Sequence, residues 1–169
     1  PGSLGGGVVM NAGAYDGEMK NVIKSVRLLD ENFKVIEVSC QDMNFSYRHS
    51  LVQERDLIVL CATFSLSPGN RDDIREKYEE FDKRRAEKQP LDLPSAGSTF
   101  KRPSGYFAGK LIDDSGLRGF THNGAGISEK HCGFVVNKNN ATAKDVLETI
   151  EIVQKVVHDK FGVNLEREV

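Results

Sequence analysis

The sequence has little net charge and no long apolar run, and both absences exclude classes of protein. The net charge at neutral pH is only −2, so no broad basic surface is available for nucleic acid or for an anionic membrane. No apolar segment approaches the roughly 20 residues that a membrane-spanning helix needs. Any anion-binding site in this protein is therefore expected to depend on a few basic residues placed close together.

Cysteine and histidine are also scarce, and they are scattered along the chain. The three cysteines are an odd number with no C-x-x-C spacing, which argues against a secreted disulfide framework and fits a reducing cytoplasm. The four histidines are equally far apart, so the sequence predicts no metal site. We expect these histidines to lie on the surface or to be hydrogen-bonded within the fold: His49, His122, His131 and His158.

The composition is that of a globular protein. With 169 residues, of which 38% are hydrophobic and 28% charged, the chain could form one domain or two small ones. Segments rich in β-branched and aliphatic residues predict strands at 22–29, 34–38 and 57–64, the first two joined by a short polar turn. The third is apolar enough to be the central strand of its sheet.

A long charged helix is expected next. Residues 71–88 are charged at fourteen of eighteen positions. Ile74, Tyr78 and Phe81 nevertheless recur at helical spacing and form a narrow apolar stripe. Asn70 is a suitable N-cap for this helix. The segment is therefore predicted to be amphipathic.

The remainder of the chain alternates short strands with helices. Helices are expected at 104–117 and 141–161, the first capped by Ser104 and the second carrying the clearest apolar stripe. Paired short strands are expected at 127–130 and 131–137. The sequence thus predicts an α+β fold with a β-rich first part and a compact α/β second part.

Residues 94–103 are expected to form a loop around which a binding or catalytic site could be organised. Its small residues let the backbone come close to a bound group, and Lys101 and Arg102 follow with two positive charges. Such a loop could hold an anion beside the hydroxyl of Ser98. The plain alternative is an ordinary surface turn followed by two basic residues.

Three further segments carry residues suited to a site. The first nineteen residues are expected to be a loop, because six of the first seven are Pro, Gly or Ser, although a short helix or strand could begin at residues 8–10. Arg48, after Tyr47, offers the paired donors that suit a carboxylate. Glu166 and Glu168 would point to one face of a C-terminal strand. The plain alternatives are a connection at a domain edge, a surface arginine beside a partly buried tyrosine, and two solvent-facing carboxylates.

In this order, these segments resemble the UDP-N-acetylenolpyruvoylglucosamine reductases, the MurB family of peptidoglycan synthesis. The resemblance extends over essentially the whole chain, and residues 105–113 also fit the pattern. One segment alone would be a weak signal, but the ordered set is specific. Arg167 departs from the pattern, in which proline is common at this position.

The resemblance implies a reaction. NADPH would reduce FAD, and the reduced flavin would pass a hydride to UDP-N-acetylglucosamine enolpyruvate to give UDP-N-acetylmuramate. Arg48 and Glu168 would stabilise charge on the substrate carboxylate, and Ser98 would deliver the proton. A free serine is a very weak acid, so Ser98 would depend on neighbouring positive charge and hydrogen bonds.

The resemblance also implies contacts with cofactor and substrate. FAD contacts are implied for small and polar residues of the first segment and for an arginine near the end of the charged helix: Gly2, Ser3, Gly6, Asn11, Gly13 and Arg85. Substrate contacts are implied for Tyr47, Lys88, Lys101 and Arg102. The three cations among these would surround a cleft for the UDP diphosphate. The plain alternative is a solvated helix end with surface charges.

Finally, the resemblance implies domain boundaries and partners. Residues 1–70 would be the remainder of a PCMH-type FAD-binding domain, 71–90 a linking helix, 91–163 the substrate-binding domain, and 164–169 a strand returning to the flavin domain. Family members carry a first flavin-binding segment ahead of this point. We therefore expect a fragment, inactive alone, from a monomeric cytoplasmic enzyme that binds a UDP-sugar and neither nucleic acid nor membrane.

Two alternatives from other classes stay open. One is another flavin-dependent oxidoreductase of the same broad fold, which would keep the Gly-rich loop but need not keep Ser98, Arg48 and Glu168 together. The other is a nucleotide-sugar-binding module without catalysis, which would use the cations for diphosphate and ignore the flavin.

Overall fold

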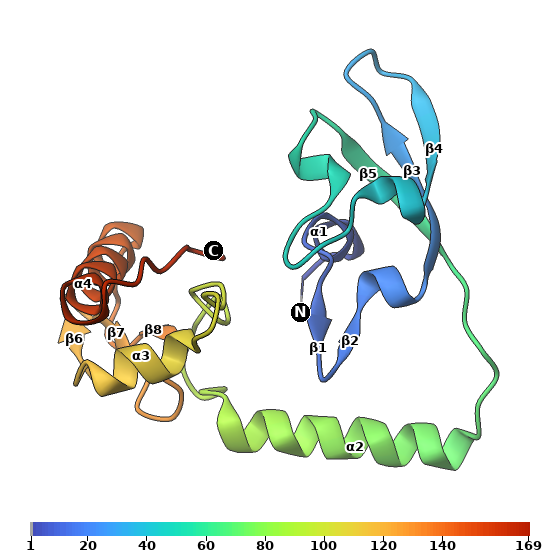
Figure 1. The fold of residues 1–169 in the computed structure, drawn as a ribbon. Coiled ribbons are helices and arrows are strands. Elements are labelled where there is room, and N and C mark those ends of the chain that lie inside the picture. The colour runs from blue at the N-terminus through green and yellow to red at the C-terminus, as the bar shows by residue number, and fades with distance from the viewer. Residues whose placement is uncertain (1) are drawn as a thin grey trace. The chain divides into compact units, whose positions relative to one another are not determined.

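The computed structural model describes residues 2–169 and divides the chain into two compact units, one ending at Arg75 and the other spanning Glu76–Val169 (Figure 1). Each unit has a hydrophobic core of its own. Both helices and antiparallel sheets are present, as the predicted α+β class requires. Pro1 of the expected N-terminal loop lies outside the described residues.

A three-stranded antiparallel sheet forms the main part of the first unit. Its strands are β3 (Ile23–Leu29), β4 (Val35–Ser39) and β5 (Ile58–Phe64). All three predicted strands are confirmed to within about a residue at each end. The order is β4-β3-β5, so the expectation that the third strand would be central was wrong. The apolar run shows which side chains β5 carries, but it cannot show which strands flank it.

The first nineteen residues are more ordered than expected. Residues Leu4–Val9 form helix α1, and Ser3 caps it by accepting a hydrogen bond from Gly6 N at 3.1 Å. Val8 is fully buried in the core of the unit. The predicted loop is therefore wrong here, because burial of Val8 and the cap outweigh a helix penalty of about 1 kcal/mol per glycine.

A small hairpin and three short 3₁₀ turns complete the first unit. The hairpin joins β1 (Gly13–Ala14) to β2 (Gly17–Glu18). The turns are Met19–Asn21, Gln41–Met43 and Leu51–Gln53. The core behind the sheet consists of residues that are less than one tenth exposed: Val8, Ile23, Val26, Leu28, Met43 and Leu57.

Helix α2 (Arg71–Lys88) has the predicted bounds. Asn70 caps it, since its side-chain oxygen accepts a hydrogen bond from Asp72 N at 2.8 Å. None of its residues, all of which the structure describes, is buried. The predicted apolar stripe therefore exists as a sequence pattern, but Ile74 and Tyr78 are 59% and 71% exposed.

The second unit packs two helices against a small antiparallel sheet. The elements are α3 (Ala108–Asp114), β6 (Thr121–His122), β7 (Ala125–Ile127), β8 (Val135–Asn137) and α4 (Ala143–Phe161), with strand order β6-β7-β8. The predicted pair of short strands is present, but Ser128–Phe134 is a loop between them. No helix among residues 2–169 combines the length and hydropathy needed to cross a bilayer.

The two helices of this unit differ in how well the sequence predicted them. Helix α4 follows the prediction, with Thr142 as N-cap and Gly162 in the left-handed region at φ 67° as C-cap. Helix α3 is shorter than the predicted 104–117, and Ser104 does not cap it. Gly105 adopts φ 77°, which turns the chain away from helical geometry and delays the helix to Ala108.

Candidate functional site

The segment around Ser98 is held by hydrogen bonds to the loop before β8. Thr99 N donates to Gly133 O at 2.8 Å, and Ser98 and Phe134 pair as an isolated antiparallel bridge. The buried Thr99 hydroxyl also accepts a bond from Val135 N at 3.0 Å. Ser98 itself remains exposed. Ser98 is thus an exposed residue on a backbone that buried neighbours fix.

The C-terminal tail lies along the other side of the same segment. Glu168 N donates to Thr99 O at 2.9 Å, and Lys101 N donates to Glu166 O at 2.8 Å. The expected strand at 164–169 is reduced to one bridge between Phe100 and Arg167. The tail nevertheless brings two predicted catalytic residues, Ser98 and Glu168, into one neighbourhood.

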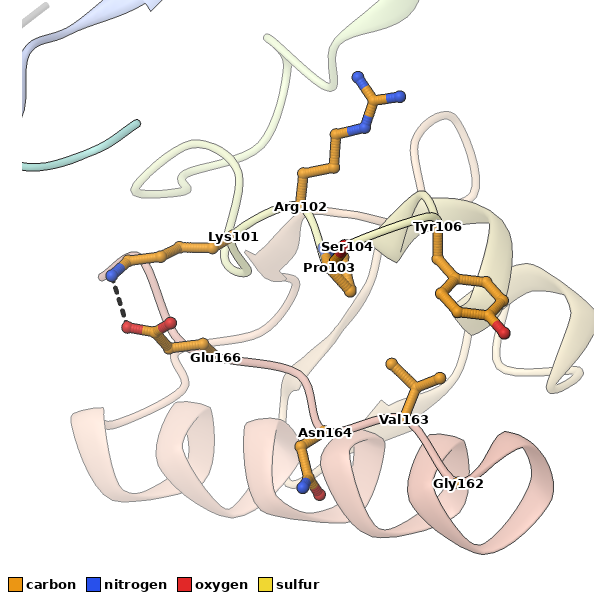
Figure 2. A pocket seen from close by; sticks show the side chains of 9 residues that line it. All are labelled: Lys101, Arg102, Pro103, Ser104, Tyr106, Gly162, Val163, Asn164 and Glu166. Atoms are coloured by element: carbon orange, nitrogen blue, oxygen red, sulfur yellow. Dashed lines mark hydrogen bonds and ion pairs between the residues drawn. The ribbon is translucent and has the colours of Figure 1, made fainter. Parts of the chain in front are cut away.

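Two of the predicted substrate cations line a cavity of about 410 Å³ beside this segment (Figure 2). Lys101 Nζ lies 2.5 Å from a carboxylate oxygen of Glu166, and Figure 2 shows Arg102 extending away from this pair. The Arg102 guanidinium lies over the ring of Phe107, 3.9 Å from its centre. The cavity therefore has one cation that is already paired with a carboxylate and one that stacks on an aromatic ring.

The remaining predicted residues of the second unit lie at the end of α2. Lys88 and Arg85 are both in its last turn and exposed. Lys88 is not among the residues that line the 410 Å³ cavity. The expected cluster of three cations is thus represented in that cavity by Lys101 and Arg102.

Tyr47 and Arg48 form the tip of a tight turn in the first unit. The turn is closed by Ser46 and His49, whose backbone groups exchange hydrogen bonds of 3.1 and 3.2 Å. Arg48 has φ 55°, a left-handed conformation that is strained for a side-chain-bearing residue and common at functional sites. Its guanidinium carbon lies 5.0 Å from the centre of the Tyr47 ring. Tyr47, a predicted substrate residue, and Arg48, a predicted catalytic residue, therefore lie side by side on this turn.

Asn11 and Gly13, both predicted to bind cofactor, are required by the fold of the first unit. Asn11 is 1% exposed, donates to Ser46 O at 3.0 Å and to the Glu18 carboxylate, and accepts from Lys20 N at 3.0 Å. A Cβ at Gly13 would lie 2.7 Å from Gly17 O. The Asn11 side chain is thus fully used inside the protein.

Small residues also create an open depression beside the hairpin. Its volume is about 460 Å³, and four of its six lining residues are glycine or alanine: Ala12, Gly13, Ala14, Gly17, Glu18 and Met19. Backbone with such short side chains can approach a flat ring closely. The hydrogen bond from Lys20, more than the charge of Arg48, keeps the pKa of Glu18 below its usual value, so the depression carries a carboxylate.

The other predicted cofactor residues lie at the start of α1. Ser3 uses its hydroxyl to cap the helix through Gly6 N. A Cβ on Gly2 would have no atom within 4 Å, so no close contact within the described residues requires glycine there. A cofactor contact of these residues remains a prediction.

Sequence reasoning missed one group beside Ser98. A Cβ on Gly133 would lie 2.9 Å from Cε1 and 3.1 Å from Nδ1 of His131, and 3.5 Å from Ser98 Oγ. The imidazole accepts a hydrogen bond from Gly133 N at 3.1 Å. The sequence gives no signal for this arrangement beyond a histidine two residues before a glycine.

The chain is similar to proteins of one family over its whole length. Residues 89–169 match the family described as UDP-N-acetylenolpyruvoylglucosamine reductase, C-terminal domain. The full chain is 59% identical to a protein of that name from Caldanaerobacter subterraneus subsp. tengcongensis and 56% identical to one from Lachnoclostridium phytofermentans. It covers 56% and 54% of these two proteins, so it spans little more than half the length of the relatives it matches.

A solved structure gives the same result. The crystal structure of UDP-N-acetylenolpyruvylglucosamine reductase (MurB) from Thermus caldophilus is similar to this chain with a TM-score of 0.86 at 35% sequence identity. The similarity covers 98% of this chain and 58% of the other.

Proposed function

Because the chain belongs to the UDP-N-acetylenolpyruvoylglucosamine reductase family, we propose that it forms part of an enzyme that reduces UDP-N-acetylglucosamine enolpyruvate to UDP-N-acetylmuramate. In this proposal the first unit is the later part of a PCMH-type FAD-binding domain and the second unit is the substrate-binding domain. The product would enter peptidoglycan synthesis.

The observation that carries the proposal is the joining of Ser98 and Glu168. Two hydrogen bonds of Thr99, to Gly133 O and from Glu168 N, bring a hydroxyl and a carboxylate from distant parts of the sequence beside one backbone segment. Reduction of a vinyl ether conjugated to a carboxylate requires a hydride at one carbon and a proton at the next. A hydroxyl proton donor on a backbone segment that is hydrogen-bonded to its neighbours on both sides is suited to the second requirement.

The proposal assigns FAD to the first unit, where the residues fit a flat cofactor. The depression around Gly13 has short side chains that a planar ring could approach, whereas the Asn11 side chain would act only by shaping that backbone. Gly2, Ser3 and Gly6 would contact the cofactor from the start of α1, and Arg85 from the end of α2. When bound, FAD would supply the hydride that it receives from NADPH.

The substrate would be held at its two charged ends. Arg48, beside Tyr47, would pair with the carboxylate of the enolpyruvyl group through its planar donors. Glu168 would act with Arg48 to stabilise the charge on the substrate carboxylate. Its backbone N–H is bonded to Thr99 O, next to Ser98. Arg102, Lys101 and Lys88 would attract the diphosphate, since the chain as a whole is slightly acidic and cannot do so through net charge.

Substitution of Ser98 tests the proposal in a full-length protein that contains this sequence. Ser98→Ala should leave flavin reduction by NADPH unchanged, because that step does not use the serine. Reoxidation of the flavin by substrate should slow about 10²–10⁴-fold, which is the usual effect of removing a positioned general acid. Ser98→Cys should recover part of the rate, since a thiol can also donate a proton. Stopped-flow absorbance resolves the two half-reactions.

Ser95→Ala is the matched control, because Ser95 is an exposed serine in the same loop. It should leave both half-reactions at the parent rate. Parent-like reoxidation by substrate in the Ser98→Ala protein would mean that the proton comes from another group.

A further inference from the structure

Gly133 occupies a narrow space between two side chains. The position that a Cβ would take lies 2.9 Å from His131 Cε1 on one side and 3.5 Å from Ser98 Oγ on the other. A Cβ on Gly109 in α3 would likewise lie 3.3 Å from Gly133 N and 3.6 Å from His131 Cε1. The imidazole therefore packs against two glycines, and one of them separates it from the predicted proton donor.

We infer that neutral His131 is a positioning residue for Ser98, because it holds the N–H of Gly133, the residue whose carbonyl oxygen binds the Ser98 segment. His131 Nδ1 accepts the hydrogen bond from Gly133 N at 3.1 Å. Gly133 O in turn accepts from Thr99 N at 2.8 Å. This inference rests on the proposed function for the role of Ser98, but the contacts themselves do not.

The geometry fixes the protonation state that can make these contacts. A ring nitrogen that accepts a hydrogen bond carries no proton, so the imidazole is the neutral form with its proton on Nε2. The ring also makes an edge contact with Phe134, at 4.9 Å between ring centres. His131 Nδ1 thus fixes the Gly133 peptide only while the ring is uncharged.

The groups around the ring favour the same state. Burial is the main cause that lowers the pKa of His131; a backbone hydrogen bond opposes it in part, and the positive charge of Arg118 lowers the pKa further. Arg118 forms a short ion pair with Asp113 of α3, and burial raises the pKa of the neighbouring Cys132 thiol, which stays neutral. Helix α3 places Gly109 against the ring, and its Asp113 is paired with Arg118.

Protonation would reverse the contact. An imidazolium carries a hydrogen on Nδ1, which would face the Gly133 N–H instead of accepting from it. The turn at Gly133 would then lose one of its two hydrogen bonds, the other being that from Phe134 N to His131 O at 3.0 Å, and the bond from Thr99 N to Gly133 O that fixes the backbone of Ser98 would weaken. The rate of proton transfer from Ser98 should therefore fall in acid as His131 becomes protonated.

Two substitutions distinguish the role of the hydrogen-bond acceptor of His131 from the packing of its ring. In His131→Asn the side-chain oxygen can accept from the backbone N–H two residues on, as in an Asx turn, but it does not titrate. In His131→Phe the ring remains and the acceptor is lost. The Asn variant should therefore behave like the parent at neutral pH, and the Phe variant should not.

The first measurement uses amide hydrogen exchange on the 169-residue chain, corrected for the intrinsic effect of pH. The Thr99 amide should lose protection about fivefold to tenfold in His131→Phe, as expected for one lost hydrogen bond. The parent should show the same loss as His131 protonates, and His131→Asn should not. The Ile127 amide, bonded to Phe120 O elsewhere in the unit, is the control and should not respond.

The second measurement uses flavin reoxidation by substrate in the full-length enzyme. His131→Phe should slow it about 10²-fold at neutral pH, as small misplacements of reacting groups do, and the difference from the parent should shrink in acid, where the parent loses the same hydrogen bond. The parent should lose rate as pH falls through the folded pKa of His131, and His131→Asn should lack this acid limb.

The outcomes distinguish the inference from the function on which it rests. Parent-like protection of Thr99 and parent-like reoxidation in His131→Phe would overturn the inference. Expected protection changes in an enzyme without reductase activity would overturn the proposed function and leave the role of His131 in holding this segment intact.

Discussion

At the scale of single residues, the two adjacent cations of the Ser98 loop are in different situations. Lys101 forms an ion pair with Glu166, and its side chain is only 25% exposed. Arg102 lies over Phe107 with its guanidinium directed away from that pair (Figure 2). Lys101 would have to give up a carboxylate to bind phosphate, and Arg102 stays fully charged while stacked.

The first prediction follows from this difference. Arg102→Ala should weaken binding of a UDP-sugar more than Lys101→Ala, by about tenfold to a hundredfold if one charge-assisted hydrogen bond is lost. Glu166→Gln is the matched variant, since it releases Lys101 and should tighten binding. Calorimetric titration at low salt measures all three. Equal losses for the two alanine variants would mean that the Glu166 pair does not restrain Lys101.

Gly13 carries a second prediction at this scale. Gly13→Ala forces a Cβ to within 2.7 Å of Gly17 O in the hairpin, and overpacking of this kind costs about 1–3 kcal/mol. Gly17→Ala is the control in the same hairpin, because its nearest contact would be an ordinary 3.7 Å to Ala14 O. Urea unfolding of the first unit measures both. If the two variants lost the same stability, close packing would not explain the glycine at position 13.

At the scale of secondary-structure elements, α4 shows how completely neighbouring residues can specify a helix. Thr142 Oγ1 accepts from Asp145 N at 3.3 Å, and the Asp145 carboxylate accepts from Thr142 N at 2.7 Å. The buried side chains of the helix recur at helical spacing: Thr149, Ile150, Val153 and Val157. These interactions join residues only a few positions apart, so the sequence predicts the helix and its ends.

The third prediction concerns this cap. Thr142→Ala should destabilise the second unit by about 1 kcal/mol at neutral pH. Hydrogen bonds from the Thr142 side chain and backbone lower the pKa of Asp145, so the contribution of its carboxylate is present above the ordinary aspartate pKa. That contribution is lost as pH falls through the lowered folded value, since the folded state then also binds the proton. The stability difference between parent and variant should therefore narrow in acid.

Thermal unfolding across this pH range measures the effect. Asp145→Asn should remove the pH dependence, and Glu151→Ala, on the exposed part of the same helix, should change stability by less than about 0.5 kcal/mol. A difference that stayed constant down to strongly acidic pH would exclude Asp145 as its source.

At the scale of the whole molecule, the chain consists of two units with separate cores. The core of the first is built around β3, and that of the second lies between α3, α4 and the β6-β7-β8 sheet. Leu28 and Ile112 are fully buried, one in each core. Contacts within one core do not involve residues of the other, so their energetic effects are expected to be additive.

The fourth prediction follows from the separate cores. Leu28→Ala should destabilise the first unit by about 2–5 kcal/mol and leave the second unchanged, and Ile112→Ala should do the reverse. Hydrogen exchange of amides in β3 and α4 reports on the two units within one sample. Loss of protection in α4 of the Leu28→Ala protein, as large as that in β3, would show that the chain unfolds as one unit.

The sequence by itself determined the elements whose causes are local. The strands β3, β4 and β5 follow from their β-branched and aliphatic residues, and the helices α2 and α4 from apolar stripes and caps, and their bounds were predicted closely. The sequence also predicted Ser98, Arg48 and Glu168 as catalytic residues, because each lies in a continuous motif that resembles a known family. The sequence did not predict the bounds of α1, where Val8 is buried in a core formed with residues far along the chain. It also placed the start of α3 too early, because Gly105 adopts a left-handed conformation.

Only the tertiary structure decided which of these residues meet. The hydrogen bonds from Glu168 N to Thr99 O and from Thr99 N to Gly133 O join segments that are far apart in the chain. The ion pair of Lys101 with Glu166 also joins distant segments, and it distinguishes Lys101 from Arg102, which stacks on Phe107. Such contacts depend on the path of the whole second unit around its core. No local pattern of hydrophobicity or turn residues specifies them, which is why the support of Ser98 by His131 is visible only in the folded protein.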